Sequence, residues 1–266
     1  EDKFYWNYNV GNHFAILGEQ PEENAELPKG QYMIVHASAI ELKKDNLKYG
    51  LYPVENNWYY DDIKTVYNKE KNRYLRYIYG EKAIQFMKLA NSLQKINKKR
   101  NRYFCKAVLG DLAEKEIINL SHYGTPTNNS VCIGCQWEQE DFTLLTAPGK
   151  DIFLVHPDLK SQNTINLTEK KITLTPHGCG VKLRNSGDVI KYLSEGILIG
   201  DKYFKKGESI NIGSDVLVRT SNMNSDELNE YIKIILGICP GTVYGKLHQM
   251  FARTKYGDFD YSSRNI

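Results

Sequence analysis

The sequence predicts an α+β fold, in which a helical segment over about residues 61–122 packs against an antiparallel or mixed β-sheet and a further helix follows near the C-terminus. Three observations lead to this prediction. Apolar residues recur with a helical period over 81–109, short runs of β-forming residues alternate with turn residues over 125–222, and a helix start signal stands at Asn224. With 266 residues, of which 41% are hydrophobic, the chain can bury a sizeable core.

The first 60 residues are expected to form strands and turns. An apolar run covers 13–18, an acidic loop with a proline follows, and 31–42 is predicted to be a buried strand. Residues 51–60 are rich in aromatic residues and Asn, which favours a hairpin at a sheet edge. We expect an N-terminal β-rich segment over 1–60 and an α+β main domain over 61–266, or a single domain that contains both.

Three helices are expected between residues 61 and 122. Asp61 and Asp62 suit the first turn of a helix, because carboxylates favour the positive end of the helix dipole, and Gly80 separates this helix from the next. The second helix covers about 81–109. Asp111, with Glu114 three residues later, predicts a capped start for a third helix that ends near residue 124.

The rest of the chain is expected to be a β meander closed by one helix. Turn residues divide candidate strands over 125–222, and Asn224 followed by Glu227 predicts a capped helix that ends at Gly237. A short helical segment is expected over about 242–253. The polar tail from residue 254 is expected to be disordered.

Residues 64–106 carry most of the positive charge of the chain. They contain thirteen Lys or Arg residues and two acids, Glu70 and Glu81, so their net charge is +11, whereas the whole chain carries +3 and the remainder sums to −8. Seven aromatic residues lie among these charges: Tyr67, Tyr74, Tyr77, Tyr79, Phe86, Tyr103 and Phe104. A cationic, ring-bearing segment in an otherwise acidic chain is typical of a protein that binds a polyanion.

The helix expected over 81–109 would carry its charges on one side. At about 100° per residue, five cations fall within about 60° of one another, namely Lys88, Lys95, Lys99, Arg102 and Lys106. The opposite side carries Phe86, Leu89, Leu93, Ile96, Phe104 and Ala107, with Arg100 as an exception. The pattern predicts an amphipathic helix with a buried apolar side and a basic outer side. Asn97 is a poor helix former, so a break near this residue is the alternative.

This arrangement predicts nucleic acid, either DNA or RNA, as the partner. The five outer cations would neutralise phosphates together with Arg73 and Arg76 from the preceding helix, and tyrosines on that face would stack on unpaired bases. Two alternatives stay open. The charges can form a solvated face that only confers solubility, or the basic helix of a non-enzymatic interaction or structural protein can dock an acidic protein partner.

Four residues have the types that metal-dependent phosphodiester cleavage requires. Glu114 stands on the expected third helix, Asp151 opens a strand, and Glu169 with Lys171 forms a Glu-x-Lys pair. This order resembles that of restriction-endonuclease-like nucleases. The resemblance implies a Mg²⁺-dependent hydrolase in which Asp151 and Glu169 hold the ion through oxygen ligands and Lys171 positions or activates the attacking water. The alternative is that 168–171 forms a solvated turn between two short strands, and no motif identifies a reaction by itself.

A second set of side chains is a candidate for zinc. Cys132 and Cys135 form a C-x-x-C motif, and His177 and Cys179 follow later in the chain. Together they have the composition of a tetrahedral Cys₃His site. The single residue between His177 and Cys179 is a shorter spacing than usual. The alternative is that Cys132 and Cys135 lie on one strand and point to opposite faces.

The composition also bears on the compartment. No apolar run approaches the ~18 residues that cross a bilayer, so no membrane interaction is expected. Five cysteines, an odd number, do not suit a disulfide scaffold, so a reducing, intracellular compartment is expected rather than secretion. The sequence contains no P-loop, dinucleotide-binding, zinc-protease or EF-hand motif.

Overall fold

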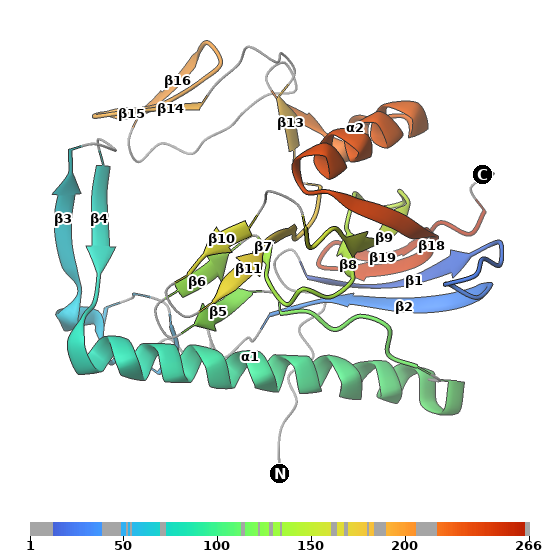
Figure 1. The fold of residues 1–266 in the computed structure, drawn as a ribbon, viewed down its shortest axis with the longest axis horizontal. Coiled ribbons are helices and arrows are strands. Elements are labelled where there is room, and N and C mark those ends of the chain that lie inside the picture. The colour runs from blue at the N-terminus through green and yellow to red at the C-terminus, as the bar shows by residue number, and fades with distance from the viewer. Residues whose placement is uncertain are drawn as a thin grey trace.

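The fold is α+β, as the sequence predicts. The computed structural model describes residues 13–38, 49–51, 53, 55–69, 73–112, 115–121, 123–127, 130–133, 135–160, 164–167, 170–179, 181–183, 190–205 and 217–263. Figure 1 shows that the long helix α1 (Gly80–Leu109) lies along one side of the molecule, whereas α2 (Ser225–Ile238) lies on the opposite side, with the main sheet between them. Every strand pair in the described part of the chain is antiparallel.

A six-stranded sheet forms the centre of the fold. Its strands lie in the order β2 (Gly30–His36), β1 (Phe14–Gln20), β18 (Gly241–Thr254), β9 (Ile152–Pro157) and β8 (Phe142–Leu144), and β19 (Gly257–Asp260) also pairs with β18. The first half of β18 pairs with β9 and its second half pairs with β1. The N-terminal strands therefore share a sheet with the last part of the chain, while the domain boundary expected at residue 60 stays a prediction.

The C-terminal region differs from the expectation. The helix expected over 242–253 is the strand β18, and the tail expected to be disordered forms β19, which returns along it. Positions 245, 247 and 249 are buried between more exposed neighbours, which is the period-two pattern of a strand. Gly245 permits close packing here, because a Cβ atom at this position would lie 2.5 Å from Leu27 Cδ2.

Apolar side chains cover both faces of this sheet, because successive residues of a strand point to opposite faces. In β9, Val155 packs with Phe142 and with Leu228 of α2, and both Val155 and Phe142 are fully buried. On the other face, Ile152 packs with Leu247 and with other residues of a second buried cluster. The sheet thus has a hydrophobic core on each of its two faces.

The start of α2 confirms the predicted cap. The side-chain Oδ1 of Asn224 accepts a hydrogen bond from the backbone N–H of Glu227 at 2.9 Å, and Glu227 Oε2 accepts one from the backbone N–H of Asn224 at 2.9 Å. This reciprocal pair satisfies two backbone donors that the helix cannot satisfy itself. The helix ends at Ile238, one residue beyond the expected Gly237.

The helix α1 confirms the second predicted helix and runs without interruption past Asn97. Asn97 is buried, and its Nδ2 donates to the backbone oxygen of Ala37 at 3.1 Å. This contact with the segment after β2 offsets the low helix propensity of Asn. Gly110 follows the last helical residue with φ 57°, a left-handed conformation that glycine adopts without strain.

The prediction of two other helices over 61–122 is wrong. The described residues between 60 and 79 form the short 3₁₀ turn η3 (Tyr60–Asp62) and then the antiparallel pair of strands β3 (Lys64–Asn68) and β4 (Arg73–Tyr77). Thr, Val and Tyr side chains favour strands, and this preference outweighs the helix start signal. The third helix is reduced to the 3₁₀ turn η4 (Gly110–Leu112), after which residues 115–121 lie outside helices and strands.

Smaller antiparallel sheets complete the described fold, together with the turn η5 (Thr220–Asn222). They are formed by β5 (Tyr123–Thr127) with β6 (Ser130–Ile133), β7 (Cys135–Gln136) with β12 (Thr175–Pro176), β10 (Thr164–Asn166) with β11 (Lys171–Thr173), β13 (Val181–Leu183) with β17 (Leu217–Arg219), and β14 (Ile190–Leu193) with β15 (Gly196–Ile199) and β16 (Lys202–Lys205). Among the described residues, no helix combines the length and apolarity needed to cross a membrane.

Candidate nucleic-acid interface

Four lysines form a line along the exposed side of α1. We call Lys88, Lys95, Lys99 and Lys106 the basic stripe; all four are exposed. Their spacing of seven, four and seven residues keeps them within about 40° around the helix axis and spreads them over about 27 Å. Within the described residues, no carboxylate forms an ion pair with any of these four ammonium groups. Its positive charge is therefore not neutralised by any carboxylate in the part of the chain that the structure describes.

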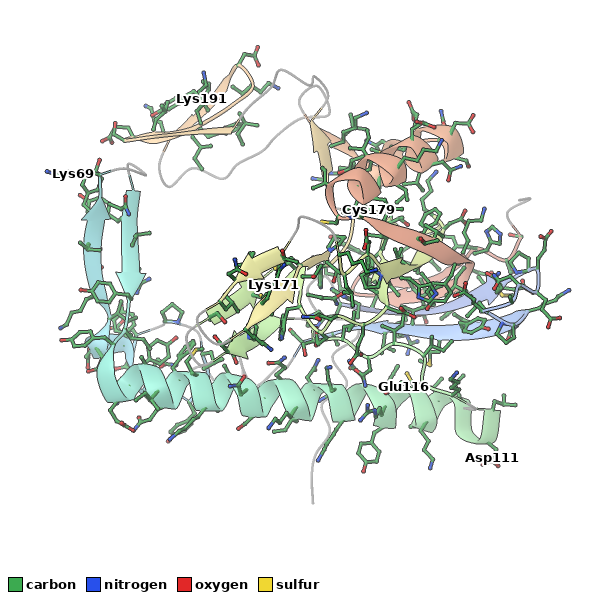
Figure 2. All side chains as sticks on the ribbon, in the orientation of Figure 1. Lys69, Asp111, Glu116, Lys171, Cys179 and Lys191 are labelled. Carbon is green, nitrogen blue, oxygen red and sulfur yellow. The ribbon has the colours of Figure 1, made fainter. Side chains whose placement is uncertain are left out.

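Arg102, the fifth cation predicted on this side, is instead neutralised by Glu116. Its Nη2 lies 2.7 Å from Glu116 Oε1 and its Nε lies 2.7 Å from Oε2, so the guanidinium and the carboxylate form a bidentate ion pair. This hydrogen bonding lowers the pKa of Glu116 and raises the pKa of Arg102. Figure 2 shows Glu116 beside the C-terminal part of α1. The partner lies on an irregular segment that the helical pattern cannot reveal.

The opposite side of α1 faces the body of the protein, with two exceptions to the expectation. Ala90, Leu93, Asn97 and Arg100 are buried, and Arg100 retains only 2% of its exposure. Phe86, Leu89 and Phe104 are half-buried. Ile96 is 45% exposed and Ala107 is exposed, so their expected burial is wrong. Both lie near the edge of the apolar side rather than at its centre.

The two arginines expected on a preceding helix lie on the hairpin. Arg73 and Arg76 belong to β4, and Arg76 is exposed. Tyr67 of β3 and Tyr74 of β4 are directly opposite each other, with ring centroids 5.2 Å apart. Figure 1 shows that the hairpin leaves the N-terminal end of α1 at a steep angle and extends from it.

An aromatic cluster fixes the base of this hairpin to α1. The ring of Tyr59 is buried and lies edge-on to Phe86 of α1, with centroids 5.3 Å apart, and to Trp58 at 5.0 Å. Burial raises the pKa of Tyr59 to about 12, whereas the charge of Arg76 opposes this increase. Lys82 of α1 donates to the backbone oxygen of Trp58 at 2.9 Å. The hairpin therefore begins from a packed base.

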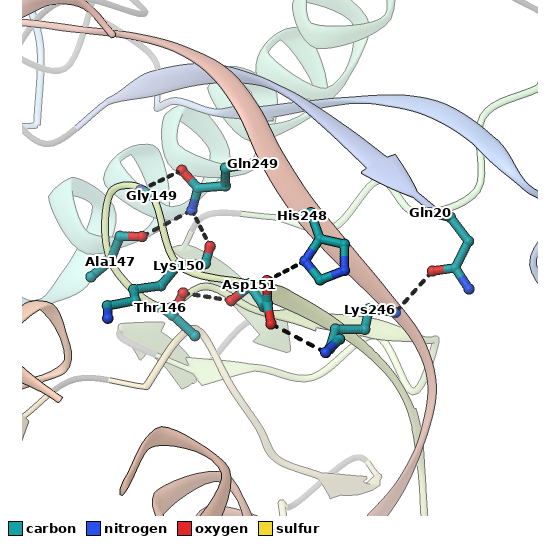
Figure 3. A network of polar contacts seen from close by, with 9 residues as sticks. All are labelled: Gln20, Thr146, Ala147, Gly149, Lys150, Asp151, Lys246, His248 and Gln249. Carbon is teal, nitrogen blue, oxygen red and sulfur yellow. Dashed lines mark hydrogen bonds and ion pairs between the residues drawn. The ribbon is translucent and has the colours of Figure 1, made fainter. Parts of the chain in front are cut away.

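Asp151, the central residue of the nuclease expectation, contacts a histidine and a lysine of β18 (Figure 3). His248 Nδ1 lies 2.6 Å from Asp151 Oδ1, and Lys246 Nζ lies 3.4 Å from Oδ2. The carboxylate orients the imidazole and leaves its Nε2 atom on the far side of the ring. Such an acid–imidazole pair can move protons, and sequence spacing gave no sign of it, because 97 residues separate the two side chains.

The turn before Asp151 is held by a buried glutamine. Gln249 Nε2 donates to the backbone oxygens of Ala147 at 2.9 Å and Lys150 at 2.6 Å, and its Oε1 accepts from Gly149 at 3.1 Å. Figure 3 shows these contacts beside the Asp151 pair. One amide thus satisfies three backbone groups and fixes the turn that places Asp151 directly before β9.

The remaining members of the nuclease pattern are not assembled around Asp151 in the described residues. Glu114 and Glu169 lie outside the residues that the structure describes. Lys171 is exposed at the start of β11, and Leu167 N–H donates to Lys170 O at 2.8 Å across the β10–β11 turn. Lys171 therefore lies on a two-stranded hairpin, whereas the resembled family has this lysine on a central strand. The Mg²⁺ site stays a prediction.

The three cysteines among the candidate zinc ligands lie in two different cores. Cys132 and Cys135 pack with Trp137 and Ile172, whereas Cys179 lies in the core beneath α2. Burial raises the pKa of Cys132 and of Cys179 to about 12, which favours neutral thiols rather than the thiolates that bind zinc. The ring of His177 lies against His36, with centroids 4.9 Å apart. The described residues contain no group of three or more metal-ligating side chains with suitable geometry.

Comparison of this chain with protein-family models, with curated proteins and with solved structures found no match.

Proposed function

We propose that this protein binds nucleic acid through the basic stripe of α1, with the ammonium groups of Lys88, Lys95, Lys99 and Lys106 contacting phosphates. The observation that supports the proposal most strongly is the alignment of these exposed lysines over about 27 Å, without acidic partners among the described residues. A solvated helix face normally alternates charge sign so that i,i+4 pairs form. In α1, eight Lys or Arg residues accompany one acid, Glu81.

The scale of the stripe suits a phosphate backbone. Lysine side chains are flexible point charges, so they tolerate variation in the positions of the phosphates. Contacts of this kind position a nucleic acid without reading its bases. We therefore expect binding with weak sequence preference and a strong dependence on salt, because each neutralised phosphate releases counterions.

The double charge reversal Lys95→Glu/Lys99→Glu tests the proposal. Each ammonium–phosphate contact at about 4 Å in water is worth about 1 kcal/mol, and reversal adds a comparable repulsion. Two reversals therefore cost up to about 4 kcal/mol before screening, and we expect affinity to fall about 10- to 100-fold at about 0.1 M salt. Fluorescence anisotropy with a labelled duplex and a labelled single strand measures both the affinity and its salt dependence.

The matched control is Lys29→Glu/Lys191→Glu, which changes the net charge equally at two exposed lysines away from α1. We expect this control to bind nearly as tightly as the wild-type protein. Equal losses in both double variants would show that net charge, rather than the stripe, governs binding. Unchanged affinity in Lys95→Glu/Lys99→Glu would contradict the proposal.

A second candidate function is the docking of an acidic protein on the same side of α1. The observation that favours it is the exposure of apolar side chains beside the stripe: Ile84 is 49%, Ile96 is 45% and Tyr103 is 57% exposed. Exposed apolar groups flanked by charge are typical of protein interfaces. A pull-down before and after nuclease treatment separates the two functions, because a protein partner is retained after the nucleic acid is destroyed.

Cleavage of the bound nucleic acid stays a separate prediction. Incubating DNA and RNA with Mg²⁺ and either the wild-type protein or Asp151→Ala tests it. Equal cleavage by both proteins would rule out a catalytic role for Asp151.

A further inference from the structure

The β3–β4 hairpin exposes an unusual number of aromatic rings. Tyr67 and Tyr74 are 43% and 61% exposed although they contact each other, and Tyr77 and Tyr79 are 47% and 64% exposed. The rings of Tyr77 and Tyr79 lie 6.2 Å apart at the junction with α1. Among the described elements, neither strand packs closely on any element except its partner.

The charges on the two strands of the hairpin are all positive. The sequences of β3 and β4 contain Lys64, Arg73 and Arg76 and no acid, and Glu70 is the one acid between residues 63 and 80. Tyr74 and Arg76 are two residues apart on one strand, and Tyr67 and Thr65 are their cross-strand partners, so these four share a face. This face combines two exposed rings with an exposed guanidinium.

Exposed rings beside cations match the chemistry of an unpaired nucleotide, which offers a flat base and a phosphate. Every base has a π-face that stacks on an aromatic side chain, and the adjacent phosphate pairs with Arg or Lys. A base in a duplex is already stacked on both sides, so its faces are closed to such contact. An acidic protein partner would engage the cations but would not use the ring faces in this way.

We propose that the β3–β4 hairpin is a stacking platform for single-stranded nucleic acid, on which Tyr67 and Tyr74 contact bases and Arg76 contacts a phosphate. This inference rests on the proposed function, since a nucleic acid is the ligand in both cases, but it concerns a different surface. The basic stripe contacts the backbone of any nucleic acid, whereas the hairpin distinguishes unpaired from paired bases.

The test compares the double variant Tyr67→Val/Tyr74→Val with the wild-type protein. Valine retains the strand preference but removes the rings, and Tyr67→Phe/Tyr74→Phe is the matched control that keeps them. The probes are labelled oligothymidylate and oligouridylate of about 16 nucleotides and a blunt duplex of the same length. Circular dichroism and urea unfolding of each variant verify that the fold is retained.

We expect Tyr67→Val/Tyr74→Val to weaken binding of both single strands by about fivefold to 150-fold, which corresponds to the loss of stacking on about one base. Duplex affinity should be unchanged, and the Phe variant should bind like the wild-type protein. Wild-type affinity of the Val variant for single strands, or an equal loss for duplex, would overturn the inference while leaving the basic stripe intact. Failure of the wild-type protein to bind any probe would overturn the proposed function itself.

Discussion

Replacing Glu116 with Gln should strengthen nucleic-acid binding, because it releases Arg102 into the basic stripe. Glu116 forms a bidentate ion pair with the guanidinium of Arg102, with two nitrogen–oxygen distances of 2.7 Å. Arg102 lies within about 40° of Lys88 around the axis of α1. One additional phosphate contact should make the slope of log affinity against log salt steeper by about 0.7 to 0.9. At about 4 Å in water the contact contributes about 1 kcal/mol, or about a fivefold gain in affinity at low salt.

The assay is fluorescence anisotropy of a labelled duplex over a series of salt concentrations. The side chains of Arg102 and Glu116 are 58% and 39% exposed, so losing their ion pair should lower the free energy of unfolding by at most about 1 kcal/mol. Glu230→Gln is the matched control, since it removes an exposed carboxylate from an ion pair with Lys233 on α2. If Glu116→Gln binds no more tightly than the wild-type protein, or if both variants gain equally, Arg102 does not add a phosphate contact when its ion pair is removed.

Two further predictions concern stability. Asn224→Ala should lower the free energy of unfolding by about 0.5 to 2 kcal/mol, because it removes the side-chain acceptor that caps α2, and urea unfolding measures the change; an unchanged midpoint would contradict the role of this cap. His156 lies between Asp141 and Glu26, with its Nδ1 2.6 Å from Asp141 Oδ1. Its hydrogen bond to Asp141, with a smaller contribution from its hydrogen bond to Glu26, raises its pKa. Because the pKa of His156 is higher in the folded state, protonation of its ring stabilises the fold. This stabilisation is fully present below the pKa of the unfolded state, about 6.5, and is lost as the pH rises through the pKa of the folded state. Urea unfolding at about pH 6 and about pH 8 should therefore show a larger decline for the wild-type protein than for His156→Gln, and equal declines would contradict the assignment.

The two α-helices could be predicted because their signals are local. The apolar period of 81–109 and the cap at Asn224 lie within the elements that they define. The strand β18 could not be predicted in this way. Its register shifts between Val243 and Gly245, which interrupts the alternation of buried and exposed residues. Its partners β1 and β9 come from the N-terminal part and the middle of the chain.

The candidate site shows the same division between local and long-range information. The lysines of the stripe follow from helical spacing alone, whereas the neutralisation of Arg102 depends on Glu116, which lies beyond the helix. The hairpin was missed because its charges and aromatic residues can be placed on either a helix or a strand. The pairing of Asp151 with His248 requires two strands that are adjacent only in the folded sheet.

If the four aligned lysines of the basic stripe bind phosphates, the affinity of the wild-type protein for nucleic acid must fall steeply as the salt concentration rises. Four contacts predict a slope of log affinity against log salt of about −2.8 for a single strand and about −3.6 for a duplex. A slope near zero, or no binding at about 50 mM salt, would contradict the account.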